Sequence, residues 1–219
     1  GIAVAAKGIN PNIKIVGVQT ANIPSMQESM KNGEVTTAFK STTIADGIAV
    51  KTPGDVTFEI INELVDEVVV VEEDEIAQGM LFLMENQKVV AEGAGAVTTA
   101  ALLSGKYVPK KDETVVCVIS GGNVDVNTLY RVIGTALTKE ARRYSFNTVI
   151  QDKPGGLAEL TKIISEYDAN ILSANLSRSS MGGALGSLTA EMVLETFNHD
   201  HIDKLKVAIT EAGFEIVEI

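Results

Sequence analysis

Two short runs of consecutive apolar residues constrain the fold of this chain more than any other feature. Residues 68–71 and 115–119 contain mainly β-branched side chains and do not alternate with polar residues. An uninterrupted apolar strand is typical of a strand covered on both faces, as in a parallel sheet flanked by helices. Helical spacing of apolar residues occurs between and after these runs, so residues 1–141 predict an α/β domain with a mostly parallel sheet.

Strand and helix alternate in this first part of the chain. Strands are expected at residues 13–18, 68–71 and 115–119, and helices at residues 24–31, 53–64, 74–87, 95–104 and 127–138. The chain opens at Gly1, without a methionine and within a helical pattern, and we therefore expect a fragment of a longer protein.

A different pattern follows residue 141. Strands are expected at residues 144–150, 170–176, 187–196 and 214–219, helices at residues 155–167 and 200–212, and a glycine-rich loop at residues 181–186. The order β-α-β-β-α-β is that of the ferredoxin-like module. We therefore predict two domains, residues 1–141 and 142–219, joined near Glu140–Arg143.

Composition excludes several classes of partner. The formal net charge is −11 and no stretch gathers Lys and Arg, so nucleic acid is not an expected partner. The longest apolar runs are shorter than the ~20 residues that a membrane span needs. Cys117 is the single cysteine, which excludes a disulfide framework and favours a reducing, cytoplasmic setting.

The run at residues 115–119 ends abruptly in Ser120-Gly121-Gly122-Asn123. Ligands of parallel α/β sheets bind at the carboxyl ends of the strands, where the next helix presents unpaired N–H groups. Two glycines allow the backbone to turn sharply and to approach a ligand closely. Taken alone, this tetrapeptide is equally consistent with a tight connection that binds nothing.

Three stretches in register favour the binding interpretation. Residues 44–50 (IADGIAV), 90–96 (VAEGAGA) and 119–125 (ISGGNVD) closely resemble the second half of the catalytic domain of threonine dehydratases, also called threonine ammonia-lyases. These are pyridoxal-phosphate enzymes that share their fold with tryptophan synthase β and serine racemase. The resemblance implies the C-terminal part of a PLP-dependent, parallel-sheet catalytic domain, followed by a ferredoxin-like regulatory domain of the ACT type.

The resemblance also implies roles for residues near the cofactor. Ser120 would hydrogen-bond the pyridine nitrogen of pyridoxal 5'-phosphate, with Gly121, Glu92 and Gly47 near the ring. A neutral hydroxyl does not hold that nitrogen protonated as a carboxylate would, which makes the ring a weaker electron sink, suited to β-elimination. For Glu92 the alternative is a plain charge at the start of a helix.

The implied reaction converts L-threonine to 2-oxobutanoate and ammonia, and a serine-preferring deaminase is the close alternative. No lysine here matches the family's cofactor-linking lysine, so we expect this fragment to have no catalytic residue of its own and to be inactive alone. An isolated amino-acid-binding and dimerisation fragment is the second hypothesis. Metal is not expected: Gln19 and Ser25 replace the acidic pair of serine racemases, and His199 and His201 fit a helix entry.

The second domain contains a candidate effector site. Asp152, Gly155, Gly156 and Leu157 join its first strand to its first helix, and glycines at a helix N-terminus bare N–H groups suited to a carboxylate. This loop, with Asn170, resembles the amino-acid-binding pattern of ACT domains, whose ligand sits between two modules. The resemblance implies isoleucine or valine as effector and a homo-oligomer. The alternative is a module that only mediates assembly.

Overall fold

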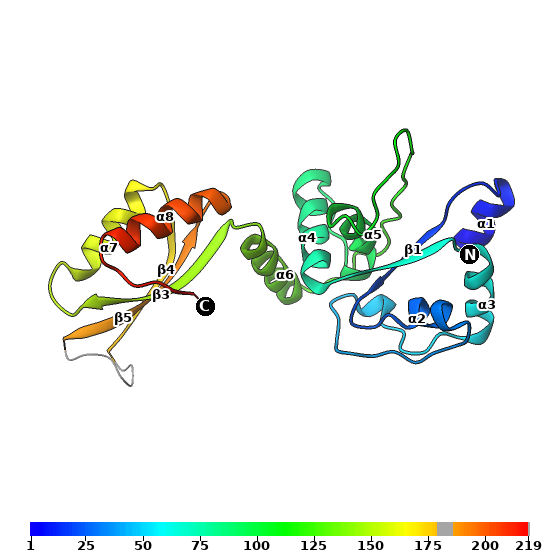
Figure 1. Ribbon diagram of the computed structural model, residues 1–219, viewed down its shortest axis with the longest axis horizontal. Coiled ribbons are helices and arrows are strands. Elements are labelled where there is room, and N and C mark those ends of the chain that lie inside the picture. The colour runs from blue at the N-terminus through cyan, green and yellow to red at the C-terminus, as the bar shows by residue number, and fades with distance from the viewer. Residues whose placement is uncertain (179–185, 219) are drawn as a thin grey trace. The chain divides into compact units, whose positions relative to one another are not determined.

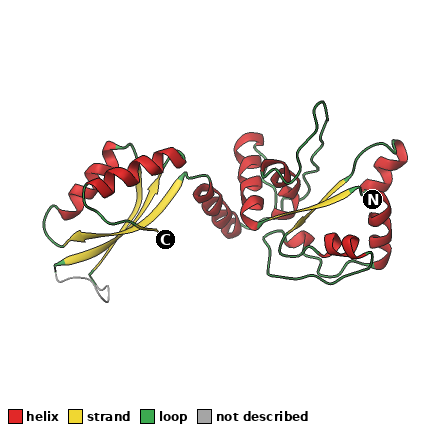
Figure 2. Cartoon of the chain, in the orientation of Figure 1, coloured by secondary structure: helices red, strands yellow, loops and turns green. Residues whose placement is uncertain are grey.

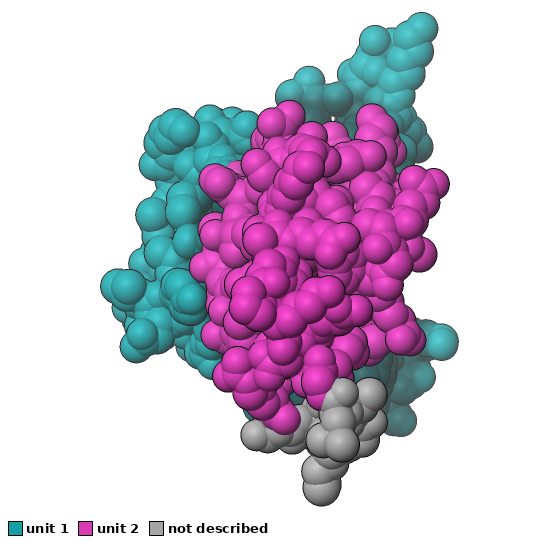
Figure 3. All heavy atoms as spheres, turned by 90° about the vertical axis from the view of Figure 1, so that its left-hand side faces the viewer, with its two compact units in different colours: residues 1–133 teal, residues 134–219 magenta. Residues whose placement is uncertain are grey.

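The structure is a computed structural model that describes residues 1–178 and 186–218. The chain forms two compact units, residues 1–133 and 134–219, coloured separately in Figure 3. The boundary falls within the long helix α6 (Val126–Lys139). The predicted glycine-rich loop at residues 181–186 lies outside the described residues, apart from Gly186.

Unit 1 alternates helices and strands, as the sequence predicted (Figures 1 and 2). Its elements are α1 (Ile2–Ile9), β1 (Val16–Thr20), α2 (Ser25–Asn32), the 3₁₀ turn Asp46–Ile48, α3 (Asp55–Leu64), β2 (Glu67–Val71), α4 (Glu73–Phe82), the π-helical turn Leu83–Gln87, and α5 (Gly93–Leu103). None of the helices in the described residues is both long and apolar enough to cross a bilayer.

The two strands of unit 1 pair in parallel, Val16 opposite Glu67 and Thr20 opposite Val71. This confirms the parallel pairing predicted from the apolar runs. Helix α4 follows β2 directly and begins with a reciprocal capping box between Glu72 and Glu75. Its apolar face packs on α5, whose small residues permit close approach, and the two helices form most of the core beside β2.

The prediction of a strand at residues 115–119 is wrong. These residues form no strand, and Val116 is 81% exposed. Strand structure depends on hydrogen bonds to a neighbouring strand, and no described strand lies beside this segment. The predicted helix at residues 74–87 also differs, because its last turn widens into the π-helical turn. The first strand begins later than predicted, at Val16.

Unit 2 has the predicted β-α-β-β-α-β order. Its elements are β3 (Arg143–Gln151), α7 (Gly156–Glu166), β4 (Asn170–Ser177), β5 (Ser187–Glu195), α8 (His199–Glu211) and the short β6 (Val217–Glu218). The sheet order β4-β5-β3-β6, with every pair antiparallel, is that of a ferredoxin-like fold. The last strand is shorter than the predicted residues 214–219.

Alternating residues of β3 and β5 build the core of unit 2. Phe146, Met192 and Leu194 are fully buried on one face of the sheet, together with Leu160 of α7 and Leu205 of α8. The opposite residues of both strands are partly or fully exposed, which is the alternation expected of a sheet covered on one face.

Tyr144 is an unusual member of this core. Its ring stacks on Phe146, and its hydroxyl is buried without a hydrogen-bond partner in the described residues. Burial raises the pKa of Tyr144 to about 12, and the nearby Glu218 carboxylate adds to the rise. Between the unfolded pKa of about 10 and the folded value, only the unfolded state loses the phenol proton. Stability should therefore fall as the pH rises through this window.

We predict that Tyr144→Phe removes this part of the alkaline loss of stability. Near neutral pH the variant should be as stable as the wild type or more stable by up to about 1 kcal/mol, because an unpaired buried hydroxyl is removed. Urea unfolding of both proteins at about pH 8 and about pH 11 measures the effect. Tyr167→Phe is the control and should keep the wild-type pH dependence; an equal alkaline loss in all three proteins would contradict the prediction.

Candidate functional site

Three separate segments of unit 1 meet at the first turn of α5. They are the 3₁₀ turn that contains Gly47, the residues Glu92 and Gly93 that open the helix, and the Ser120–Asn123 turn. The structure therefore brings together all four predicted cofactor-binding residues, Ser120, Gly121, Glu92 and Gly47. Each belongs to one of the three stretches that the sequence analysis singled out.

The side chain of Glu92 lies at the centre of this arrangement. Its Oε2 accepts a hydrogen bond from the N–H of Asn123 at 3.0 Å, and its own N–H donates to the carbonyl of Gly121 at 3.3 Å. The carboxylate makes no side-chain cap bond to α5. A Cβ placed on Gly47 would lie 3.4 Å from Oε1 of Glu92. Glu92 thus bonds to the Ser120–Asn123 turn and lies close to the loop that contains Gly47.

Glycines are required where the chain passes closest to Glu92 and α5. Gly121 has φ +75°, and a Cβ on it would lie 2.3 Å from Oε1 of Glu92. A Cβ on Gly95 would lie 1.8 Å from the carbonyl oxygen of Ser120. The backbone of the Ser120 turn therefore rests directly on the first turn of the helix.

Glu73 supports the site from the side of β1, and the sequence analysis did not identify it. Its Oε1 accepts from the hydroxyl of buried Thr20 at 2.8 Å, and its Oε2 accepts from the N–H of Ile44 at 2.7 Å. The carboxylate therefore ties the carboxyl end of β1 to the loop that contains Gly47. An acidic residue just after a buried parallel strand, here β2, is the signal that could have revealed it.

The far side of the turn is fixed by Asp125. Hydrogen bonds from the hydroxyl and the N–H of Thr128 hold the pKa of Asp125 below its usual range. Asp125 therefore stays ionised and anchors the start of α6 after the glycine turn.

The residues present fit the ring of a pyridoxal phosphate. Ser120 is exposed, and its hydroxyl makes no hydrogen bond to any other described residue. Gly121 and Gly122 follow it as bare backbone, because a Cβ on them would lie 2.3 Å from Oε1 of Glu92 and 3.0 Å from the carbonyl oxygen of Val90, respectively. A free hydroxyl beside a surface of bare backbone suits a flat ring with a hydrogen-bonding nitrogen.

The predicted effector residues do not all lie together. Asp152, Gly155, Gly156 and Leu157 follow the end of β3, where Arg178 pairs with the Asp152 carboxylate at 2.8 and 3.0 Å. This pair holds the pKa of Asp152 below its usual range. Gly155 has φ +93°, and a Cβ on Gly156 would lie 2.3 Å from the carbonyl oxygen of Gln151. Glycine is therefore required at both positions.

Asn170 lies at the opposite end of the same sheet. On β4, Asn170 pairs with Glu195 of β5, and Arg143 at the start of β3 pairs with the same residue. The end of β3 pairs with Ser187, at the other end of β5. The side-chain amide of Asn170 donates to the Glu195 carboxylate at 3.1 Å. Within one chain, Asn170 cannot share a small ligand with the Asp152 loop.

His199 is the first residue of α8, and His201 makes local contacts at the start of the same helix. His201 Nδ1 accepts from the N–H of Phe197 at 3.1 Å, its Nε2 lies 2.5 Å from the carbonyl oxygen of Tyr167, and its ring stacks on Phe197. Asn198 caps helix α8 through the N–H of His201. In the described part of the chain, no group of three or more His, Cys, Asp or Glu residues could hold a metal ion.

In unit 1 a glycine turn and a helix N-terminus converge beside a free serine hydroxyl, an arrangement typical of ligand-binding sites in parallel α/β proteins. Comparison with known families identifies the cofactor. The family described as pyridoxal-phosphate dependent enzyme matches residues 1–121, more than half of the chain. The chain belongs to this family.

Individual relatives agree with this assignment. The L-threonine ammonia-lyase of Thermotoga maritima is 45% identical over 216 residues, which cover 99% of this chain and 53% of that protein. The catabolic L-threonine dehydratase TdcB of Escherichia coli is 48% identical over 137 residues, covering 61% of this chain and 41% of the relative. The structure of processed threonine deaminase isoform 2 from Solanum lycopersicum matches with a TM-score of 0.55 and 32% identity, over 62% of this chain and 40% of that one.

The chain spans about half the length of the curated relatives that it matches most extensively. The match to the Thermotoga maritima protein includes both units, whereas the match to TdcB is too short to do so.

We predict that Gly95→Ala disrupts the site, because the new methyl group would displace the carbonyl of Ser120. Overpacking of this kind should lower the free energy of unfolding by about 1–3 kcal/mol. Gly8→Ala in α1 is the matched control, since nothing lies within 4 Å of its Cβ position. That change should stabilise the protein slightly, by up to about 1 kcal/mol. Urea unfolding of both variants measures the difference, and equal effects would contradict the predicted contact.

Proposed function

We propose that this chain is part of a pyridoxal-phosphate dependent threonine ammonia-lyase, in which it forms one wall of the cofactor site. The observation that carries the proposal is the convergence of residues 44–50, 90–96 and 119–125 on the Glu92 carboxylate. The names of the relatives that match over both units support threonine as the substrate. Deamination of L-serine is the second candidate, because the part of the relatives that this chain does not span also contributes to the site.

Each residue of the site has a defined part in this proposal. When bound, the cofactor supplies an electron sink for elimination of the threonine hydroxyl. The Ser120 hydroxyl would donate a hydrogen bond to the unprotonated ring nitrogen, which would leave the ring a moderate sink. Gly121 and Gly47 would allow the backbone to approach the ring, and Glu92 would hold the Ser120–Asn123 turn in place through the N–H of Asn123.

The chain alone is proposed to be inactive, because no lysine in it matches the one that links the cofactor. In this proposal residues 1–141 belong to the catalytic domain and residues 142–219 form an ACT-type regulatory domain. The alternative role of the isolated chain is that of an amino-acid-binding and dimerising module. A reducing, cytoplasmic setting fits a sequence with a single, partly buried cysteine, Cys117.

Complementation tests the catalytic proposal. The chain is co-refolded with the part of the Thermotoga maritima relative that it does not span, and pyridoxal phosphate is added. We expect the mixture to form 2-oxobutanoate from L-threonine. Ser120→Ala should lower kcat by about 10- to 100-fold, which corresponds to the loss of one strong hydrogen bond.

Ser104→Ala is the control for this experiment. Ser104 lies in the same unit, after α5, and among the described residues its hydroxyl bonds only to the carbonyl of Ala100. Its replacement should leave kcat unchanged. A faster reaction with L-serine than with L-threonine would favour the serine deaminase, and unchanged kcat in Ser120→Ala would remove Ser120 from the site.

For unit 2 we propose an amino-acid site formed by two copies of the chain. The Asp152 loop offers a charged side chain and the N-terminus of α7, which suit the ammonium and carboxylate groups of an amino acid. Asn170 lies at the other end of the sheet, so it can complete such a site only from a second copy. The ligand is proposed to be isoleucine or valine, and the module alternatively mediates assembly alone.

A thermal-shift titration of the whole chain tests this second proposal. L-isoleucine or L-valine should raise the melting temperature progressively with concentration, since ligand bound to the folded state stabilises it. L-lysine should not. Asp152→Asn should abolish the shift, whereas Asp203→Asn, an exposed change on α8, should retain it. A melting temperature that no amino acid changes would support the assembly-only role.

A further inference from the structure

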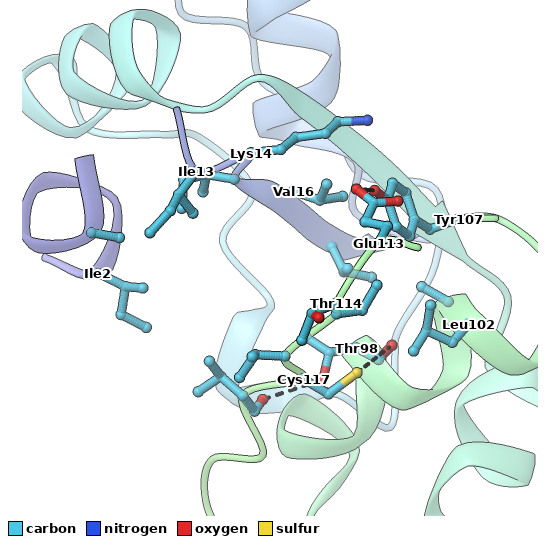
Figure 4. A pocket seen from close by; sticks show the side chains of 17 residues that line it. Ile2, Ile13, Lys14, Val16, Thr98, Leu102, Tyr107, Glu113, Thr114 and Cys117 are labelled. Carbon is cyan, nitrogen blue, oxygen red and sulfur yellow. Dashed lines mark hydrogen bonds between the residues drawn. The ribbon is translucent and has the colours of Figure 1, made fainter. Parts of the chain in front are cut away.

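The hollows of the two units differ in chemistry. The cavity of unit 1, of about 380 Å³, is lined mainly by aliphatic side chains such as those of Ile2 and Leu102 (Figure 4). Unit 2 contains a hollow of about 520 Å³ with a mainly polar lining, which includes the carboxylates of Asp168 and Glu195 and the ring of Phe197. We call this second hollow the polar pocket. Its charges suit a charged ligand rather than an apolar one.

Three segments of unit 2 form the polar pocket. Asp168 lies in the turn after α7, Glu195 ends β5 and is followed by Phe197, and Arg142 precedes β3. The N–H of the buried Thr196 donates to the carbonyl of Arg142 at 3.1 Å and so ties two of these segments together. The pocket is thus formed before a ligand arrives, which lowers the entropic cost of binding.

The ring of Phe197 is held in place at the rim of this pocket. It stacks on the ring of His201 with the centroids 4.7 Å apart, and the N–H of Phe197 donates to His201 Nδ1 at 3.1 Å. Phe197 nevertheless remains 65% exposed. An exposed aromatic ring beside carboxylates can contact both an ammonium group and the aliphatic stem that carries it.

The two carboxylates of the polar pocket form no ion pair within the described part of the chain. Asp168 accepts no side-chain hydrogen bond there, and Glu195 Oε2 accepts from the neutral amide of Asn170 at 3.1 Å. Arg142 pairs with Glu140 at 3.3 Å. The pocket therefore has two negative charges for which the chain supplies no paired cation.

Arg143 is the cross-strand neighbour of Glu195, but its guanidinium group lies against α6. Its Nη1 is 3.3 Å from the position that a Cβ of Gly134 would take. The absence of a side chain at Gly134 leaves room for the guanidinium there. Arg143 thus forms no ion pair with Glu195 among the described residues.

The size of the polar pocket favours an organic cation over a metal ion. Its volume lies in the range of small-molecule sites, about 300–1,000 Å³. In the residues that the structure describes, no group of three or more His, Cys, Asp or Glu side chains could hold a metal ion. Two carboxylates call for two positive charges, and the ring of Phe197 suits an aliphatic stem between them.

We propose that the polar pocket binds a linear aliphatic diamine. One ammonium group donates to Asp168, the other donates to Glu195, and the stem lies on the ring of Phe197. A free amino acid fits less well, because its own carboxylate would approach two like charges. The site lies within one chain and involves neither the cofactor turn nor the Asp152 loop.

A titration of the whole chain with putrescine, followed by amide NMR at low ionic strength, tests this inference. We expect saturable shifts at the amides of Asp168, Ala169 and Thr196. Asp168→Asn should weaken binding by about tenfold, because one charge-assisted hydrogen bond is lost. Asp168 has φ +56°, a conformation that asparagine also adopts readily, so this variant should keep the fold.

Asp203→Asn is the matched control, since it removes the same charge from an exposed position of α8 and should bind putrescine as the wild type does. Butylamine, with one ammonium group, and L-lysine, with an added carboxylate, should each bind more weakly than putrescine. Equal weakening in the two variants would show only a general attraction to a chain of net charge −11 and would overturn the proposal. So would the absence of saturable shifts, or butylamine binding as tightly as putrescine.

Discussion

The hydrogen bond between the Glu92 carboxylate and the N–H of Asn123 is the interaction on which the candidate site depends. It joins the start of α5 to a turn that lies about thirty residues further along the chain. The bond between the Glu92 N–H and the Gly121 carbonyl closes the same contact from the other side. Among the described residues, these two bonds tie the Ser120–Asn123 turn itself to the start of α5, and the Thr98 hydroxyl holds the preceding residues through the carbonyl of Val118 at 3.2 Å.

A second carboxylate, that of Glu73, also joins two separate segments of unit 1, on the side of β1. It binds the end of β1 and the Ile44 N–H, and so places the loop that contains Gly47 against α5. A Cβ on Gly93 would lie 2.5 Å from the Ile44 carbonyl oxygen, which shows how closely this loop follows the helix. Two acidic side chains and several glycines, rather than a large apolar core, thus shape the site.

Much of this arrangement was predictable from local patterns. Helical periodicity located α3 and α8, and alternation located β5, because these elements bury one face within their own unit. The strand at residues 115–119 could not be judged in this way. Its pattern describes an environment covered on both faces, and strand structure also needs a neighbour that no described residues provide.

The site shows the same division between local and distant information. The motifs predicted that Ser120, Gly121, Glu92 and Gly47 surround one cofactor, and the structure brings these four residues together. The supporting role of Glu73 depends on contacts with Thr20 and Ile44 that no local pattern reveals. In unit 2, the loop at Asp152 and Asn170 are near in sequence, yet the length of β3 and α7 separates them in space.

The most direct test of the central claim is the hydrogen-exchange rate of the Asn123 amide, measured by NMR in the wild type and in Glu92→Ala. The Asn127 amide, which donates to Asp125 at 2.9 Å, is the internal reference. Loss of the carboxylate should speed exchange at Asn123 and leave Asn127 unchanged. Equal rates at Asn123 in the two proteins would show that Glu92 does not hold the turn, and the account of the site would then be wrong.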